Sequence, residues 1–437
     1  MGHTSRLGDK LPPALVRRFT RPLARFLAIE SAGGVVLLAC TLVALAAANS
    51  PLAAAYHHFW HTPVWLEVGG WRLGGGLGHF VVNDVLMTVF FFVVGLEIKR
   101  EVVAGELRDP RKAALPVAAA LGGMVVPAGI YLVLQGDTAA GRGWGVPMAT
   151  DIAFVVGVMA LLGRRVPFGL KIVLLSLAIA DDLGAVVVIA AFYSGTLAWG
   201  MLALAAGGFL LAHGLNRAGV RAVPVYLVVG TGIWLAVYRS GVHPTIAGVV
   251  LGLMTPASAW LGDKTLVEVL TEATARAPGE GHERFDTLRA VGYAAREGLS
   301  PLARLEHGLH PWVGFVIMPL FALANAGVAV QPAAVADPVA VAVALGLLIG
   351  KPVGIVLFAF VSVRAGVAAL PTGVGWRVMA GGGALGGIGF TMSMFVANLA
   401  FDDPAHLDAA KVGILVGSTA SAALGAALLA LAGRRAA

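Results

Sequence analysis

Long apolar runs separated by short polar stretches recur along the whole chain. About twelve of these runs approach or reach the length of roughly 20 residues that a helix needs to cross a bilayer. The predicted spans are 28–49, 81–98, 114–134, 146–162, 170–193, 196–216, 222–238, 242–256, 310–331, 338–360, 377–399 and 411–433. The pattern predicts an all-α polytopic membrane protein with one transmembrane domain, residues 28–433, between short segments 1–27 and 434–437.

Two stretches depart from the apolar pattern. Residues 50–80 contain VWLEVGGWRLGGG, whose alternation is broken by Gly69-Gly70 and favours a small β-hairpin outside the membrane, with a plain loop as the alternative. Residues 257–306 form a charged, partly helical connection with APGEGHE as its flexible centre. The first span ends in ALAAANS, which resembles a cleavage site, but its length and the following spans favour a retained helix over a cleaved leader.

Composition supports the membrane assignment, and charge gives an orientation. Hydrophobic residues make up 58% of the chain and charged residues only 13%, against about 25% in soluble domains. Successive loops lie on opposite sides of the membrane, and nearly all basic residues fall in the loops of one side. The loops of the other side contain only Arg72, Arg142, Arg239 and Lys411. Positive loops stay cytoplasmic, so both termini should be inside. The net charge of +7 is therefore topological and does not indicate nucleic-acid binding. Cys40 is the only cysteine, which excludes an internal disulfide.

The stretch SLAIADDLGAVVVIA places Asp181 and Asp182 together inside a predicted span. Asp181 lies about 14 Å along the helix from Ile172, near the middle of the bilayer. A charged carboxylate there costs about 3 kcal/mol or more, so intramembrane acids are functional by default. Neighbouring helical side chains point about 100° apart, so the two acids can line one polar cavity. A purely structural pair is the alternative.

Two spans carry helix-breaking residues beside polar groups. In GWGVPMATDIAF, Pro147 precedes Thr150 and Asp151, and GGGALGGIGFTMSMF (381–395) interrupts a late span. Irregular backbone at bilayer depth is tolerated only where protein buries it or it lines a cavity, so the two breaks together predict a binding site at discontinuous helices. Close helix packing is the alternative for the glycines. Lys351 lies about 14 Å from Phe360 along its helix, too deep for simple snorkelling.

These features occur in stretches that closely resemble the NhaA family of sodium/proton antiporters, from about residue 28 to 433. The matching stretches are NDVLMTVFFFVVGLEIKRE, PMATDIAFVVGVMALLG, LKIVLLSLAIADDLGAVVVIAAFY, SGVHPTIAGV, LEHGLHPWVGFVIMPLFALANAGV, LLIGKPVGI and GIGFTMSMFVANLAF. The resemblance implies inverted repeats and two discontinuous helices. The connection before Arg304 and the first 27 residues depart from the family pattern.

The resemblance also implies roles, residue by residue. Asp182 would be the main cation-binding carboxylate, and Asp181 its partner in taking and releasing protons. Thr150 and Asp151 would lie where the broken helices cross, and Lys351 would face the same assembly, as a proton carrier or as a structural charge.

Further polar residues match the family on either side of this crossing. Asp84 matches its membrane acid on the second span. The resemblance assigns pH sensing at the cytoplasmic entrance to Glu97, Arg100, Glu101 and Glu306. His243 matches the family's pH-linked histidine, although a lone loop histidine is more often structural.

The implied activity is secondary transport, without a cofactor or enzymatic reaction. Cytoplasmic Na⁺ or Li⁺ would exchange for external H⁺ by alternating access, electrogenically and under pH control, in the inner membrane of a bacterium. A homodimer through the 50–80 hairpin is a candidate assembly, and the sequence leaves the oligomeric state open. The chemistry agrees: a hard cation prefers oxygen ligands, and a buried carboxylate can hold either a proton or Na⁺.

Two other functions use similar residues. An intramembrane aspartyl protease needs aspartates on separate helices, whereas Asp181 and Asp182 are adjacent and no GxGD sequence surrounds them or Asp151. A sodium-coupled symporter for an organic anion could share broken helices. It would move a second solute with sodium, whereas an antiporter changes pH when sodium alone is added.

Overall fold

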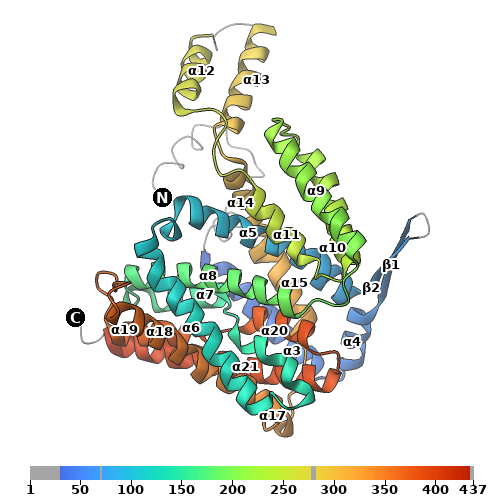
Figure 1. Ribbon diagram of the computed structural model, residues 1–437, viewed down its shortest axis with the longest axis vertical. Coiled ribbons are helices and arrows are strands. Elements are labelled where there is room, and N and C mark those ends of the chain that lie inside the picture. Colours follow the sequence, from blue (N-terminus) through green and yellow to red (C-terminus); the bar gives the residue numbers. More distant parts are fainter. Residues whose placement is uncertain (1–29, 69–70, 277–281, 434–437) are drawn as a thin grey trace.

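The computed structural model describes residues 30–68, 71–276 and 282–433. The segments 1–27 and 434–437, the residues Gly69-Gly70 and residues 277–281 of APGEGHE lie outside the described residues. Within the described residues the chain is almost entirely helical, with one two-stranded sheet (Figure 1).

Eight apolar helical stretches in the described residues are long enough to cross a membrane. Three of them contain a π-helical part, η1, η5 or η6. The stretches comprise η1 (Gly78–Leu86) with α5 (Met87–Ala104), α6 (Pro110–Gln135), α8 (Phe168–Phe192), α9 (Trp199–Arg217), α10 (Val223–Ser240), α14 (Pro301–Trp312) with η5 (Val313–Ile317) and α15 (Met318–Asn325), α17 (Pro338–Leu345) with η6 (Gly346–Gly350) and α18 (Lys351–Arg364), and α21 (Pro404–Gly433). The predicted multi-span helical membrane fold is confirmed.

Three further apolar helix pairs in the same residues are bent by more than 40° at a short break. Two are the expected discontinuous helices: η3 (Ala139–Met148) with α7 (Ile152–Leu162), bent by 41°, and α19 (Trp376–Gly386) with α20 (Phe390–Ala400), bent by 45°. The third was not expected. It joins α3 (Glu30–Ala48) to α4 (Ala53–His61) at 114°, where Pro51 disfavours helical backbone in the residue before it.

Shorter helices lie between the long spans, and some helix boundaries differ from those predicted from the sequence. The short apolar helix α11 (Thr245–Met254) occupies the expected span 242–256. Helix α14 begins at Pro301 rather than near 310, because Ser300 caps it by accepting a hydrogen bond from the Ala303 amide at 3.1 Å. Three short helices complete the fold: η2 (Glu106–Arg108), η4 (Gly163–Arg165) and α16 (Pro332–Val335).

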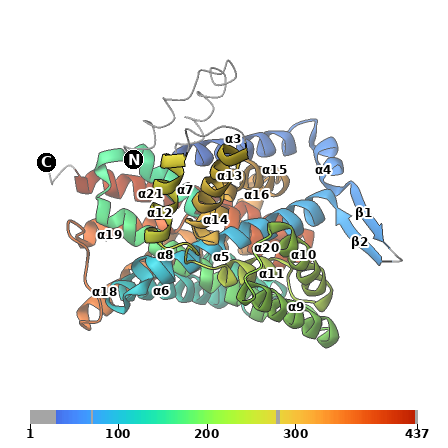
Figure 2. The same cartoon turned by 90° about the horizontal axis from the view of Figure 1, so that it is seen from above.

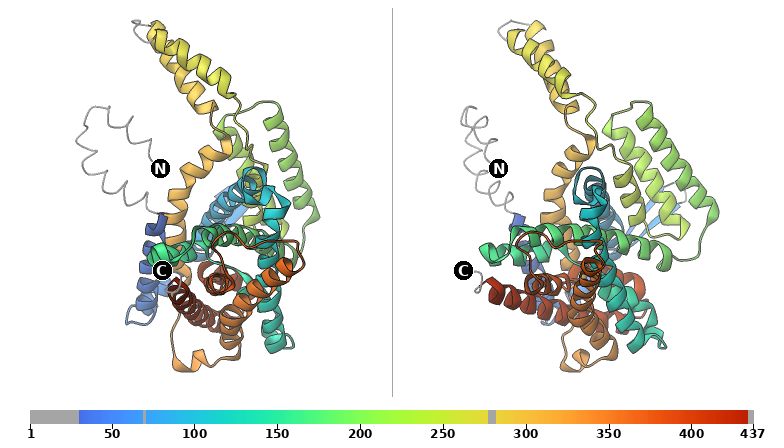
Figure 3. Two further views of the ribbon diagram at one scale, coloured as in Figure 1. Left: turned by 90° about the vertical axis from the view of Figure 1, so that its left-hand side faces the viewer. Right: turned by 60° about the vertical axis from the view of Figure 1, so that its left-hand side comes forward.

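Two elements project from the helical body. Strands β1 (Pro63–Val68) and β2 (Trp71–Gly76) pair antiparallel, with Leu66 opposite Leu73, and extend outward beside α4 (Figure 2). The expected β-hairpin is therefore present. Helices α12 (Asp263–Arg276) and α13 (His282–Glu297) form an antiparallel pair inside the charged connection 257–306, and they reach well beyond the rest of the molecule (Figure 3).

The membrane helices pack as two groups. The crossing group contains α6, η3, α7, α8, α17 to α21 and η6, in which α6 packs along α18 and α8, and α19 packs along α21. The flanking group contains α3, α4, η1, α5, α9 to α11, α14, η5 and α15, in which α5 packs along α11 and α3 along α15. Helices α7 and α8 reach across to α3 and α5. Both breaks lie in the crossing group.

Candidate functional site

The two helix breaks touch each other. Between η3 and α7 the backbone is extended at Ala149 and Asp151, and the Asp151 amide donates to the Ile388 carbonyl of the other break at 2.7 Å. A side chain at Gly389 would collide with the Ser393 hydroxyl and come within 2.9 Å of the Ala149 carbonyl oxygen. Glycine is therefore required at Gly389 because the two chains approach so closely there.

Asp151 neutralises the helix ends that meet at this crossing. Its Oδ1 accepts from the Phe154 amide at 3.2 Å and so caps α7. Its Oδ2 accepts from the Thr391 amide at 3.0 Å, in the first turn of α20, and also from the Thr391 hydroxyl. Helix N-termini carry partial positive charge, and the single buried carboxylate of Asp151 compensates this charge at the N-termini of both α7 and α20.

Thr150 and Lys351 contact the opposite, negative helix ends. The Thr150 hydroxyl donates to the carbonyl of Gly386, the last residue of α19, at 3.1 Å. The Lys351 ammonium donates to the carbonyl of Met148, the last residue of η3. Cationic and donor groups at helix C-termini complement the partial negative charge there.

Lys351 is also the ion-pair partner of Asp181. Its Nζ lies 2.7 Å from Asp181 Oδ2, and neither side chain is more than 1% exposed. The other oxygen of this carboxylate, Oδ1, is buried and has no hydrogen-bond partner among the described residues. Asp182 follows on α8 and is 3% exposed. The structure thus brings Asp181, Asp182 and Lys351 together beside the first break. Asp181 Oδ1 is the acceptor oxygen that has no hydrogen-bond donor there among the described residues.

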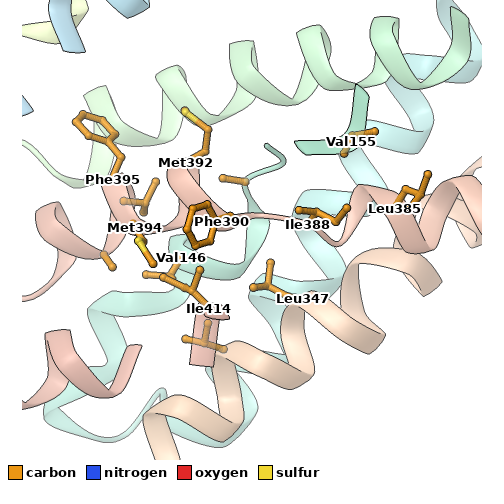
Figure 4. Close-up of a cluster of buried hydrophobic side chains, with 14 of the residues drawn as sticks. Val146, Val155, Leu347, Leu385, Ile388, Phe390, Met392, Met394, Phe395 and Ile414 are labelled. Carbon is orange, nitrogen blue, oxygen red and sulfur yellow. The ribbon is translucent and has the colours of Figure 1, made fainter. Parts of the chain in front are cut away.

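Apolar side chains enclose the crossing. Val146 and Val155 flank the first break, and Ile388 and Phe390 flank the second (Figure 4). Leu347 of η6 belongs to the same buried cluster. Such surroundings exclude water and strengthen the electrostatic interactions of the few charges inside.

Asp84 and His243 meet away from this crossing. Asp84 is buried in η1, with Oδ1 at 3.7 Å from His243 Nε2 and Oδ2 at 3.4 Å from His79 Nδ1. His243 also packs edge-on against Phe395, with ring centres 5.3 Å apart. His79 was not identified from the sequence. The π-helical turn of η1 brings it beside a residue five positions later.

The charged residues at the end of α5 form a separate cluster. Arg100 pairs with Glu306 of α14 and lies 3.9 Å from Glu101, measured from Nη2 to Oε1. Glu97 Oε1 lies 3.8 Å from Nδ1 of His310, another residue that sequence reasoning missed. Four of the five residues expected to act together therefore gather here, whereas His243 contacts Asp84, Thr245 and Phe395.

Comparison with known proteins gives the family. The family model described as Na⁺/H⁺ antiporter 1 matches residues 24–429. The chain is 51% identical over 423 residues to the Na⁺/H⁺ antiporter NhaA of Rhodopirellula baltica, with 96% of each chain covered. It is 48% identical over 422 residues to the Na⁺/H⁺ antiporter NhaA of Rhizobium meliloti, with 95% of this chain and 96% of the relative covered. This chain belongs to the NhaA family of Na⁺/H⁺ antiporters.

A third relative, Na⁺/H⁺ antiporter NhaA 2 of Acidiphilium cryptum, is 49% identical over 425 residues, covering 96% of this chain and 94% of the relative. NhaA proteins are transporters, so the chain is a transporter and not an enzyme. The family predicted from the sequence motifs is confirmed. The apolar helical spans show that the chain is a multi-span membrane protein. Thr391 could not be identified as a site residue from the sequence, because its contact with Asp151 joins two segments that lie far apart in the chain.

Proposed function

We propose that this chain exchanges cytoplasmic Na⁺ or Li⁺ for external H⁺ by alternating access, electrogenically and under pH control. The observation that carries the proposal is the buried Lys351–Asp181 ion pair beside Asp182, where two broken spans cross. The surroundings are apolar, so few groups at the crossing other than these can bind a proton or a cation. The carboxylates and helix-end carbonyls supply oxygen ligands for a hard cation.

Cargo binding and proton release are coupled through Asp181. A cation held by Asp182 and the unpartnered Oδ1 of Asp181 would compete with Lys351 for the Asp181 carboxylate. An unpaired ammonium at this depth is costly, so Lys351 would release its proton as the cation arrives. Together with protons displaced from the carboxylates, this makes exchange electrogenic. Asp151 and Thr150 hold the helix ends in place while the charge at the crossing changes.

The charged cluster on α5 and α14 is the candidate pH sensor. Arg100 forms ion-pair contacts with Glu101 and Glu306, and Glu97 lies beside His310. The Arg100 side chain is 47% exposed, so the cluster is in contact with solvent. Asp84, the membrane acid, lies 3.7 Å from His243 through its Oδ1 and is a second candidate for the pH response.

We place the protein in the lipid bilayer of the bacterial inner membrane with both termini cytoplasmic. The support is the alternation of basic loops along the sequence. The domain limits remain those of the sequence: a transmembrane domain at 28–433, with 50–80 periplasmic and 257–306 cytoplasmic.

A homodimer through the hairpin is also part of the proposal. Two-stranded sheets have two free edges, which are templates for pairing with a second copy. Trp65 and Leu66 at the centre of β1 are 50% and 57% exposed, and as neighbours on a strand they point to opposite faces. Each face of the hairpin therefore presents a large apolar side chain beside the open hydrogen-bonding edges.

Proteoliposomes with an imposed pH gradient test the exchange. Adding Na⁺ or Li⁺ alone, without any organic solute, should dissipate the gradient, while K⁺ serves as the comparison ion. A gradient that collapses only when an organic anion is added with sodium would establish the symporter instead. Cleavage of a membrane peptide by the purified protein would support the protease.

A further inference from the structure

Three buried or half-buried asparagines link the two helix groups on the side of the molecule that carries the β-hairpin. Asn83 lies in η1, which follows β2 directly, and Asn325 is the last residue of α15. Both belong to the flanking group. Asn398 lies on α20, the second half of a broken span in the crossing group.

The asparagines are joined by direct hydrogen bonds. Asn83 and Asn325 each donate to the other's amide oxygen, at 3.2 and 2.9 Å. Asn398 Nδ2 donates to Asn325 Oδ1 at 3.0 Å and to the Met394 carbonyl at 2.8 Å. The reciprocal pair is internal to the flanking group, whereas the Asn398–Asn325 bond connects that group to α20.

An aromatic contact lies beside this bond. Phe395 is three residues before Asn398, so both side chains lie on one face of α20. The Phe395 ring is fully buried, with its centre 5.1 Å from that of Phe91 and 6.3 Å from that of Phe321, both in the flanking group. Asn398 and Phe395 together seal α20 against the flanking helices on the hairpin side of the crossing.

We infer that Asn398 and Phe395 are the gate on the hairpin side, closed in this structure, and that the Asn398–Asn325 bond breaks whenever the crossing opens to that side. The inference rests on the proposed alternating access, in which the two groups move relative to each other. One neutral hydrogen bond is weak enough to break in each cycle. The Asn83–Asn325 pair stays intact, so Asn325 keeps a partner when Asn398 leaves.

Thiol labelling measures the closure directly. In a Cys40→Ser background, Ser393→Cys places a reporter on α20, where the native hydroxyl is buried and has no hydrogen-bond partner. An impermeant reagent applied from the hairpin side should label the reporter about three to ten times faster once Asn398→Ala is added, because one net hydrogen bond is lost.

The matched control is Asn49→Ala. Asn49 also forms long-range hydrogen bonds on the hairpin side, to Val328 at 2.8 Å and Val330 at 2.9 Å, but these stay within the flanking part of the molecule. The control should leave labelling at the parent rate. Equal rates in all three proteins, or equal acceleration by both alanines, would overturn the gate assignment.

A crosslink gives a second test that does not depend on Asn398→Ala folding normally. Asn325→Cys with Asn398→Cys, bridged by a short reducible thiol crosslinker, should stop Na⁺/H⁺ exchange in proteoliposomes, and reduction should restore it. Continued exchange by the bridged protein would show that these helices do not separate. If the unbridged parent performs no exchange at all, the proposed function fails, whereas labelling still tests the closure by itself.

Discussion

Lys351 Nζ lies 2.7 Å from Asp181 Oδ2 and also donates to the Met148 carbonyl at the end of η3. One buried ammonium therefore contacts both the acid next to Asp182 and the end of a broken helix. The two roles expected for Lys351, proton carrier and helix-end charge, are both available to the same group. Neither contact excludes the other, so a measurement of charge movement has to separate them.

Lys351→Gln separates these roles. The amide can still donate to Met148, so the helix end stays capped, but it carries no exchangeable proton. We expect proteoliposomes containing the variant to retain Na⁺/H⁺ exchange that has become electroneutral. The readout is whether an imposed membrane potential still drives sodium movement. Retained exchange that still responds to potential would make Lys351 a stability residue, to be followed by thermal unfolding.

Asp182→Asn should remove cation binding while the protein stays folded. The amide keeps the shape of the carboxylate but lacks its charge and its exchangeable proton. We expect sodium affinity at alkaline pH to fall by about a hundredfold or more, since losing one partner of a buried charge pair costs about 3–5 kcal/mol. Isothermal titration calorimetry measures this, with the exposed Asp137→Asn as control. Undiminished sodium binding in the Asp182 variant would place the site elsewhere.

Wild-type protein should show competition between protons and sodium at the same carboxylates. Protonation removes the charge that holds the cation, so the apparent sodium affinity should weaken as pH falls and recover as pH rises. Calorimetric titrations at a series of pH values follow this directly. A sodium affinity that does not vary with pH would contradict a shared site.

Asp151→Asn tests the helix ends at the crossing. The carboxylate accepts from two helix N-termini and from a hydroxyl, whereas an amide offers only one acceptor oxygen. We expect a loss of about 1–3 kcal/mol in the free energy of unfolding, seen as a lower melting temperature. Asp337→Asn is the matched control, because Asp337 caps the start of α17 alone. A larger loss in the control would argue that the double contact of Asp151 contributes little.

The sequence was most informative where one residue type is unusual for its surroundings. Aspartates and a lysine at bilayer depth are costly, so Asp181, Asp182, Asp151 and Lys351 could be identified from their position within apolar runs. The breaks could be located because proline and clustered glycine disfavour continuous helix.

Contacts between distant segments could not be predicted in the same way. Thr391 on Asp151 and His310 on Glu97 join elements that no local periodicity connects. The sharp bend before α4 was missed because Asn49, Ser50 and Pro51 mark the end of the first span but do not show that a second apolar helix follows it. The asparagine link was missed because single amides in long apolar runs carry no charge that marks them as costly.

The orientation can be tested with two single cysteines. In the Cys40→Ser background, Leu66→Cys lies on the β-hairpin and Val267→Cys on α12, and the native side chains are 57% and 60% exposed. An impermeant thiol reagent applied to intact cells should label Leu66→Cys and not Val267→Cys. The opposite pattern would reverse the topology inferred from the basic loops. Comparable labelling of both after membrane disruption is the accessibility control.

Gly389→Ala tests how closely the two breaks must approach. A Cβ at Gly389 would collide with the Ser393 hydroxyl and lie 2.9 Å from both the Ala149 carbonyl oxygen and a Leu347 methyl group. The backbone oxygen cannot move without shifting the first break, so we expect the melting temperature to fall and sodium binding to weaken together. Gly129→Ala is the matched control, because a Cβ there meets nothing within 4 Å and alanine favours α6 by up to about 1 kcal/mol. The control should therefore melt at the parent temperature or above it. If Gly389→Ala is as stable as the control and binds sodium normally, the breaks can separate without cost, and the contact between them does not define the site.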